Sequence, residues 1–407
     1  MQEQPENKNF LSVFSFSLLS ISEGRLFMNF VCPRCGNSSP RYIGYKNGEA
    51  YCRRCISFHG EELTYKKKEG KEAPLNLHYA LSPEQAKLSE EIVSNYKKGI
   101  DTLVYAVCGA GKTEISYAVI SYAIYHGLSV GFALPRRDVA IELFWRLKDA
   151  FPQNKIVAVY GQHTSILEGD VIILTTHQLF RYKQYFDLLV MDEIDAFPFK
   201  GNDTLQSLYH NSVRGHSVLM SATPSEEVLR EFKKEGHAIL ELRTRFHKQK
   251  IPVPVIKKMP NTFLLPYLVY KLKNYIKEKK PVFIFAPTID LCESLFRYLS
   301  IFVKGGECVH SKKENRGEII GNFKKNQYLY LVTTSVLERG VTFKNLQVIV
   351  THTDQEEIYS SSTLIQIAGR VGRKMDAPGG DVLFLCEKET GSIRRAIDEI
   401  RFCNTFL

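Results

Sequence analysis

The chain has 407 residues, with 54 lysines and arginines against 44 aspartates and glutamates, and its formal net charge is +10. Hydrophobic residues make up 44% of it and charged residues 24%, which excludes a disordered tail protein and a fibrous repeat. No uninterrupted apolar run reaches the roughly 18 residues that a spanning helix needs, so we do not expect an integral membrane protein. The length predicts two or three domains.

Residues 1–28 are expected to form an N-terminal extension. The apolar stretch at 10–21 is short and rich in serine, and it lacks the basic start that is typical of a secretory signal. These features favour a cytoplasmic protein. Met28 is an alternative start that the sequence leaves open.

Four of the nine cysteines form one constellation within residues 29–60: Cys32, Cys35, Cys52 and Cys55. Two C-x2-C pairs separated by sixteen residues predict a structural, tetrahedral zinc site, with four free thiols or a redox pair as the alternative. Between the pairs we expect a hairpin with Asn47-Gly48 at its bend. The other five cysteines are scattered, as expected of buried thiols in a reducing compartment: Cys108, Cys292, Cys308, Cys386 and Cys403.

The cysteine segment is also basic and aromatic. Cations pair with phosphates and aromatic faces stack on unpaired bases, so we favour nucleic-acid contact over a merely solvated surface. The residues concerned are Arg34, Arg41, Lys46, Arg53 and Arg54, with Tyr42, Tyr45 and Tyr51 between them.

A polar stretch at 61–80 is expected to be a linker. Beyond it, short β-branched runs alternate with amphipathic segments, which predicts parallel sheets buried on both faces. The runs lie at 103–107, 130–135, 171–176, 188–193, 217–223, 282–287, 328–334, 347–353 and 382–386. A proline-containing, cationic break at 243–260 divides them into two α/β domains, at 81–242 and 261–407.

The first run leads into AVCGAGKT, residues 106–113, which has the pattern of a P-loop. The small residues Ala106, Gly109 and Gly111 allow backbone N–H groups to surround a phosphate, and the following helix directs its positive end at the same anion. Lys112 is expected to reach the β- and γ-phosphates, and the hydroxyl of Thr113 to hold Mg²⁺.

A pair of carboxylates follows the apolar run LLVM, at the expected carboxyl edge of a strand. Ligands bind at that edge in open α/β sheets. We expect Asp192 to bind Mg²⁺ and Glu193 to orient and deprotonate the attacking water.

Three further motifs are weak when each is taken alone: SAT at 221–223, TTSVLERGVTF at 333–343 and QIAGRVGR at 366–373. The last is expected to open a helix that carries Arg370 and Arg373 on one side. These arginines could reach the γ-phosphate from the second domain and neutralise charge in the transition state.

Taken in order over residues 81–373, about three-quarters of the chain, the motifs resemble a superfamily 2 helicase core with two RecA-like lobes. The resemblance implies that Gln85 contacts adenine, that Gly340 lines the nucleotide cleft and that Gln366 acts with the two arginines. It also implies that Ser221 and Thr223 couple hydrolysis to lobe movement. The residues it places along a nucleic-acid strand are Pro135, Arg136, Arg137, Thr176, His177 and Thr334.

A four-cysteine module ahead of a compact DEAD-like core is similar to the ComFA family of ATPases in bacterial natural transformation. This resemblance implies an ATPase that uses Mg²⁺ and one structural Zn²⁺ and drives single-stranded DNA into the cytoplasm. The implied partners are that DNA, a membrane DNA-uptake channel and other competence proteins, with a homo-oligomer left open. The implied location is cytoplasmic, including a peripheral position at the inner face of the membrane.

Residues 242–280 carry eleven lysines and arginines and one acid, Glu278. This concentration favours phosphate binding; a solvated helix face and a membrane-surface role are the alternatives.

Two other functions compete with the motor. One is a duplex-DNA helicase of replication restart or repair, and the other is a nucleic-acid-binding scaffold that nucleotide only switches. Because no large insertion could act as a strand-separating wedge, we favour movement on single strands. ATP hydrolysis with and without single-stranded DNA distinguishes the scaffold from the enzymes.

Overall fold

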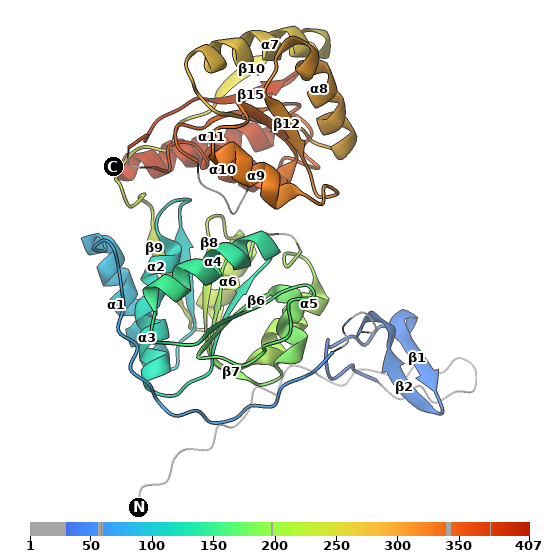
Figure 1. The fold of residues 1–407 in the computed structure, drawn as a ribbon. Coiled ribbons are helices and arrows are strands. Elements are labelled where there is room, and N and C mark those ends of the chain that lie inside the picture. The colour runs from blue at the N-terminus through green and yellow to red at the C-terminus, as the bar shows by residue number, and fades with distance from the viewer. Residues whose placement is uncertain (1–29, 56–57, 59, 197, 339–342, 375) are drawn as a thin grey trace, which may run out of the picture.

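The computed structural model describes residues 30–407 except 56–57, 59, 197, 339–342 and 375 (Figure 1). Two layered α/β lobes lie one above the other, and a small hairpin module stands to one side of the first lobe, beyond α5 (Asp203–Ser212). The N-terminal extension expected at 1–28 lies outside the described residues. Among those that are described, no helix combines the length and the apolar composition needed to cross a membrane.

The module contains the expected hairpin. Strands β1 (Ile43–Lys46) and β2 (Glu49–Cys52) pair antiparallel, and the short 3₁₀ turns η1 (Pro40–Tyr42) and η2 (Arg53–Cys55) flank them. Asn47 and Gly48 form the bend with φ of 52° and 83°, a conformation that asparagine and glycine adopt at low cost.

Residues 60–80 contain neither helix nor strand among those described, but they do not hang free. The segment runs along lobe 1, where its backbone N–H groups donate to carbonyls of that lobe and Ala73 is buried. The donors are Leu63, Lys71 and Asn76. The segment expected as a linker is therefore an ordered connection that packs against lobe 1 and joins the module to it.

Lobe 1 is built on a parallel seven-stranded sheet in the order β5-β6-β4-β7-β8-β3-β9. Its central strands are apolar runs buried on both faces, as parallel sheets require. The strands are β3 (Thr102–Ala106), β4 (Val130–Leu134), β5 (Ile156–Val159), β6 (Val171–Thr175), β7 (Phe186–Met191), β8 (Val213–Ser221) and β9 (Ala238–Leu242). The helices besides α5 are α1 (Pro83–Lys97), α2 (Lys112–Ile115), α3 (Tyr117–Tyr125), α4 (Arg137–Ala150), α6 (Glu226–Lys234) and the 3₁₀ helix η3 (Thr176–Arg181).

Lobe 2 is built on a parallel six-stranded sheet in the order β10-β15-β14-β11-β13-β12. Its strands are β10 (Val255–Lys258), β11 (Val282–Phe285), β12 (Gly306–Val309), β13 (Tyr330–Thr333), β14 (Gln347–Val350) and β15 (Val382–Cys386). Its helices are α7 (Asn261–Lys277), α8 (Ile289–Phe302), α9 (Arg316–Lys324), α10 (Ser361–Ala368) and α11 (Gly391–Cys403), with the 3₁₀ turns η4 (Ser335–Leu337) and η5 (Asn404–Phe406).

The two parallel sheets confirm the fold class predicted from the apolar runs. Four strands were not predicted: β5, β9, β10 and β12. Strand β10 lies inside the segment expected to join the lobes, at the edge of the second sheet, where Lys257 and Lys258 remain exposed. An edge strand needs no continuous apolar run, so its sequence gave no such signal.

Candidate functional site

The sequence motifs gather at the carboxyl edge of the first sheet, because each of them follows a strand. The P-loop follows β3, the carboxylate pair follows β7, and SAT closes and follows β8. Pro135 and Arg136 follow β4, and Thr176 follows β6. The strand order β6-β4-β7-β8-β3 therefore sets the expected nucleic-acid residues beside the expected nucleotide residues in one row.

The P-loop has the backbone of an anion cradle. Gly109 and Gly111 take φ of 84° and 81°, which side-chain-bearing residues rarely adopt. A Cβ on Gly111 would also lie 2.3 Å from Nε2 of Gln85, so a larger residue would displace that side chain. Lys112 begins the following helix, and its Nζ lies 3.5 Å from the carbonyl oxygen of Ala106.

Gln85 is fixed to the P-loop. It closes a capping box at the start of α1, where its Oε1 accepts from the backbone N–H of Ser82 at 2.9 Å. Its Nε2 donates to the carbonyl of Ala110 at 2.7 Å. The side chain thus links α1 to the phosphate loop, and its contact with adenine stays a prediction.

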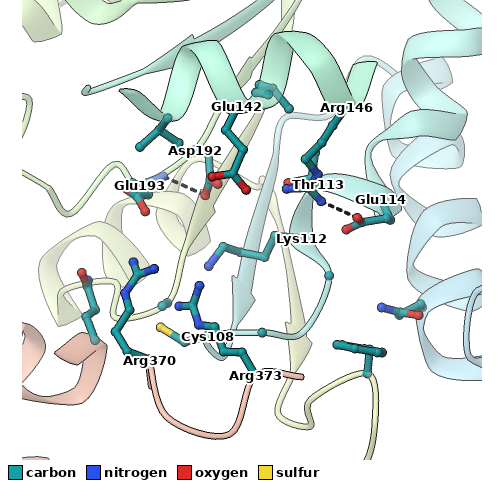
Figure 2. A pocket seen from close by; sticks show the side chains of 18 of the residues that line it. Cys108, Lys112, Thr113, Glu114, Glu142, Arg146, Asp192, Glu193, Arg370 and Arg373 are labelled. Atoms are coloured by element: carbon teal, nitrogen blue, oxygen red, sulfur yellow. Dashed lines mark hydrogen bonds and ion pairs between the residues drawn. The ribbon is translucent and has the colours of Figure 1, made fainter. Parts of the chain in front are cut away.

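A cavity of about 1030 Å³ lies at the seam and is lined by both lobes (Figure 2). Its size suits a nucleotide. Arg370 and Arg373 point into it from lobe 2, toward Lys112, with Asp192 and Glu193 on the opposite side. The expected site residues that line it are Gln85, Gly109, Gly111, Lys112, Thr113, Asp192, Glu193, Gln366, Arg370 and Arg373. Gly340, also expected there, lies outside the described residues.

Glu193 has an unusual backbone. Its φ is 59°, and its N–H donates to Oδ1 of Asp192 at 2.8 Å. A left-handed non-glycine residue costs on the order of 1–3 kcal/mol and tends to occur where function needs it. The turn keeps both carboxylates at the wall of the cavity.

Asp195, the last residue of DEID, joins the two lobes and was not predicted as a site residue. From lobe 1, the hydroxyls of Ser221 and Thr223 donate to its carboxylate at 2.8 and 2.7 Å. From lobe 2, Nε2 of Gln366 donates to it at 2.8 Å. The two SAT residues expected to couple hydrolysis to lobe movement therefore contact a carboxylate that lobe 2 also holds.

The sequence predicts that the arginine motif opens a helix, but the motif spans the end of one, because Gln366, Ile367 and Ala368 are the last residues of α10. Helix α10 ends at Ala368, and Arg370 and Arg373 lie in the turn and at its exit. Nε of Arg370 donates to the carbonyl of Glu338 at 2.7 Å. Burial, and then the positive charge of the nearby Arg373, lowers the pKa of Arg370 well below its usual value. A guanidinium in this position favours an anionic ligand.

Arg245 was counted among the surface cations, but only 1% of it is exposed. Nη1 donates to the carbonyls of Val371 and Gly372 at 3.0 and 2.9 Å, and Nη2 donates to that of Gly369 at 3.1 Å. Burial, and then the charge of Arg373, lowers the pKa of Arg245 to about 10. Arg245 therefore stabilises the turn that carries Arg370 and Arg373, and it is not part of a surface patch.

The expected strand-contact residues are divided in their exposure. Arg137 and His177 are exposed, whereas Pro135, Thr176 and Thr334 are buried at the ends of their strands. Arg136 turns across the seam instead: Nη1 donates to the carbonyls of Ser335 and Val336 at 3.2 and 3.0 Å. Its Nη2 donates to Oε1 of Glu338 at 2.9 Å. In this arrangement Arg136 is an interlobe contact.

The Arg136–Glu338 pair gives the first testable expectation. Arg136→Glu and Glu338→Arg should each lower strand-stimulated ATP hydrolysis at least tenfold, because truncating or reversing one member of a largely desolvated pair costs about 2–5 kcal/mol. The double exchange should recover most of the loss. Arg230→Glu serves as the control, because Arg230 is an exposed arginine of α6 whose Nε donates to the carbonyl of Glu226 in its own helix. If the double exchange hydrolyses ATP as slowly as the single variants, the interlobe pair is contradicted and Arg136 is better explained as a nucleic-acid contact.

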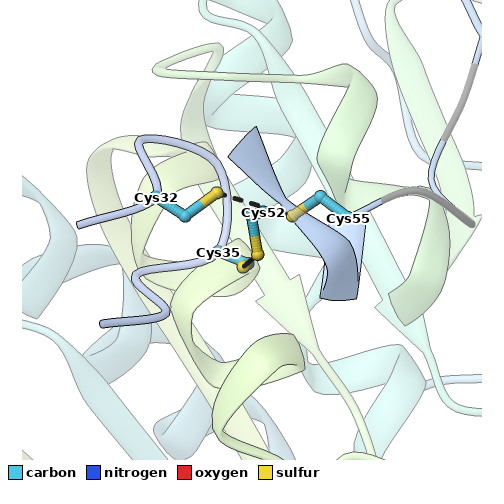
Figure 3. A group of neighbouring side chains, drawn as sticks. All are labelled: Cys32, Cys35, Cys52 and Cys55. Carbon is cyan, nitrogen blue, oxygen red and sulfur yellow. Dashed lines mark hydrogen bonds between the residues drawn. The ribbon is translucent and has the colours of Figure 1, made fainter. Parts of the chain in front are cut away.

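The four cysteines of the module converge, as predicted (Figure 3). Their sulfur atoms all lie within 4.8 Å of one another and all four residues are buried. The Sγ atoms of Cys32 and Cys55 are 3.6 Å apart, as are those of Cys35 and Cys52. Tetrahedral Zn–S bonds of about 2.3 Å require sulfur–sulfur distances of about 3.8 Å, so the residues fit a zinc ion held by four thiolates.

Zinc analysis provides a second expectation. The purified chain should carry one zinc per molecule, and Cys55→Ser should lose most of it, because three thiolates hold the ion less tightly and leave a position open to water. Cys403→Ala, at an isolated buried cysteine of α11, is the matched control and should keep the full equivalent. Full zinc retention by Cys55→Ser, measured by elemental analysis, would contradict the assignment.

Comparison with known proteins agrees with this geometry. The DEAD/DEAH box helicase family model matches residues 82–232, and the helicase conserved C-terminal domain matches 266–375. Competence protein ComFA of Streptococcus pneumoniae is 35% identical over 94% of this chain and 91% of its own length. Competence protein ComFA of Bacillus subtilis is 33% identical over 92% and 85%. The structure of S. cerevisiae Dbp5 bound to RNA and ADP BeF3 superposes with a TM-score of 0.60 at 17% identity, covering 81% of this chain and 93% of that one.

Proposed function

The chain belongs to the ComFA family of competence proteins, and on that basis we propose that it is a motor that moves along single-stranded DNA and drives transforming DNA into the cytoplasm. It is a competence-related, ATP-hydrolysing enzyme with a DEAD-like helicase core. The steps from that enzyme to strand movement and DNA uptake are the proposal.

One observation supports this proposal most directly. The cavity at the seam is lined by residues of both lobes, and it lies next to the sheet edge that bears the expected nucleic-acid contacts. A nucleotide there would contact Lys112 on one lobe and Arg370 and Arg373 on the other. Loss of the γ-phosphate would remove contacts that hold the lobes together, and reopening would change their grip on a strand.

Each side chain has one task in this mechanism. The P-loop N–H groups and Lys112 bind the phosphates, and Thr113 and Asp192 would hold the Mg²⁺, which supplies charge neutralisation. Glu193 orients and deprotonates the attacking water, and Gln366 holds Asp195 from lobe 2. Arg370 and Arg373 neutralise charge that develops on the transferred phosphoryl group.

The strand itself would lie along the carboxyl edges of both sheets. The exposed Arg137 and His177 offer the first contacts on lobe 1, and Thr334 marks the corresponding strand end on lobe 2. Backbone phosphates would supply most of the affinity, which should fall steeply with salt. The partners expected from the family, an uptake channel and other competence proteins at the cytoplasmic side of the membrane, belong to the same proposal.

Strand movement is tested by the displacement of streptavidin from the end of a biotinylated single-stranded DNA. Mg·ATP should accelerate displacement from one end of the strand, and Lys112→Ala should abolish the acceleration. A tailed duplex offered in parallel tests the rival helicase: efficient strand release by the protein alone would favour duplex unwinding. Failure to displace streptavidin from either end, with ATP hydrolysis intact, would rule out the motor.

A further inference from the structure

The hairpin module contacts the part of lobe 1 that begins with Thr176 and His177. The ring of Phe58 lies 6.5 Å from that of His177 and 5.7 Å from that of Phe180, both in η3. Nη1 of Arg34 donates to the carbonyl of Phe58 at 2.7 Å, and the backbone carbonyl of Arg34 accepts from Asn211 at 2.9 Å. The module therefore adjoins an expected strand contact.

A groove of about 460 Å³ separates the module from lobe 1. Tyr51 of β2 lies on one wall, and Phe180 and the exposed Lys183 lie on the other. An exposed aromatic side chain such as Tyr51, with a lysine on the facing wall, suits an unpaired base and its phosphate.

Aromatic and basic side chains also lie on the face of the hairpin that adjoins the groove. In the register of β1 and β2, Cys52 shares a face with Ile43, while Tyr51 lies opposite Gly44 on the other face, next to Lys46 and Glu49. A Cβ on Gly44 would come within 2.5 Å of the Tyr51 ring, so the ring lies over a position where only glycine leaves room. Tyr51 nonetheless remains 38% exposed, which leaves ring surface available for stacking.

The charge of the module complements a polyanion. Arg34 is engaged by Glu62 and the Phe58 carbonyl, but four other cations face a single carboxylate, Glu49. They are Arg41, Lys46, Arg53 and Arg54, of which all but the half-buried Arg54 are exposed. A zinc ion with four thiolates would carry a formal charge of about −2, and the four cations exceed that charge and Glu49 together, which favours phosphate binding.

We propose that this groove and the adjoining hairpin face bind single-stranded nucleic acid, as an extension of the strand path on lobe 1. The inference rests on the proposed function. Tyr51 stacks on a base that has left the helicase core, and Lys183 and Lys46 pair with the flanking phosphates. Because every base offers a π-face, this contact is independent of sequence.

The test measures the affinity of the full-length, zinc-loaded chain for fluorescent oligothymidylates of increasing length. Wild type should gain affinity in two stages, first as the oligonucleotide fills the core and again as it reaches the module. Tyr51→Ala and Lys183→Glu should each remove the second gain, weakening long oligonucleotides by roughly 5- to 100-fold, and leave short ones unchanged.

Two control variants and a measurement of zinc content keep the outcome unambiguous. Tyr51→Phe keeps the ring and should bind as wild type does, and Lys233→Glu, at an exposed lysine of α6, should not weaken binding selectively for long oligonucleotides. Lys183 lies on lobe 1, so its variant tests the groove even if Tyr51→Ala disturbs the module, which zinc content reports. A second gain that survives in Lys183→Glu overturns the inference, whereas a wild type that binds no short oligonucleotide overturns the proposed function instead.

Discussion

Arg370→Ala is expected to lower kcat for ATP hydrolysis by about 10³-fold or more, because an arginine that neutralises transition-state charge contributes 10³–10⁵ in rate. Arg370 lines the cavity with only 2% of its surface exposed, and its Nε donates to the carbonyl of Glu338. Ground-state binding needs it less, so KM should change by less than about tenfold. Steady-state kinetics with saturating single-stranded DNA measures both constants.

The matched control for this variant is Arg394→Ala, which removes an exposed arginine of α11 that pairs with Glu389. Its kcat should stay within about twofold of wild type. Equal losses in kcat and in the binding of a fluorescent nucleotide by Arg370→Ala would instead mean that the arginine only maintains the fold of the turn.

Glu193→Gln should have the second largest effect, a loss of about 10²–10⁴ in kcat, because the amide cannot accept the proton of the attacking water. Lys112, Thr113 and Asp192 remain, so nucleotide binding should persist. The variant should therefore hold ATP with the lobes closed and bind single-stranded DNA more tightly with Mg·ATP than without it.

Glu142 offers the comparison, since it lines the same cavity from α4 but does not end a strand of the sheet. Glu142→Gln should lose less than about tenfold in kcat. If Glu142→Gln and Glu193→Gln lose similar amounts of the hydrolysis rate under single turnover, Glu193 is not the residue that deprotonates the attacking water.

The sequence was most informative where a motif is local. The position of a P-loop or of a carboxylate pair after an apolar run can be predicted from the sequence, because the preceding β-strand ends at the carboxyl edge of the sheet. The structure accordingly brings Lys112, Asp192 and Glu193 to one cavity. The two parallel sheets followed from the same apolar runs.

The sequence was least informative where a contact joins distant segments. Nothing near Arg245 signals that its guanidinium meets three carbonyls more than a hundred residues away. Arg136 was assigned to the strand because of its motif, but it reaches Glu338 across the seam. Asp195 could have been suspected as the third carboxylate of DEID, yet its partners Ser221, Thr223 and Gln366 come together only in the fold.

The most direct test of the account is steady-state ATP hydrolysis measured against the concentration of single-stranded DNA, in wild type and in Lys112→Ala. If the seam couples nucleotide to strand, wild-type hydrolysis should rise at least tenfold and saturate with the strand, and Lys112→Ala should stay at background throughout. A hydrolysis rate that does not change with the concentration of single-stranded DNA, or that persists in Lys112→Ala, would contradict the coupling on which the proposed motor depends.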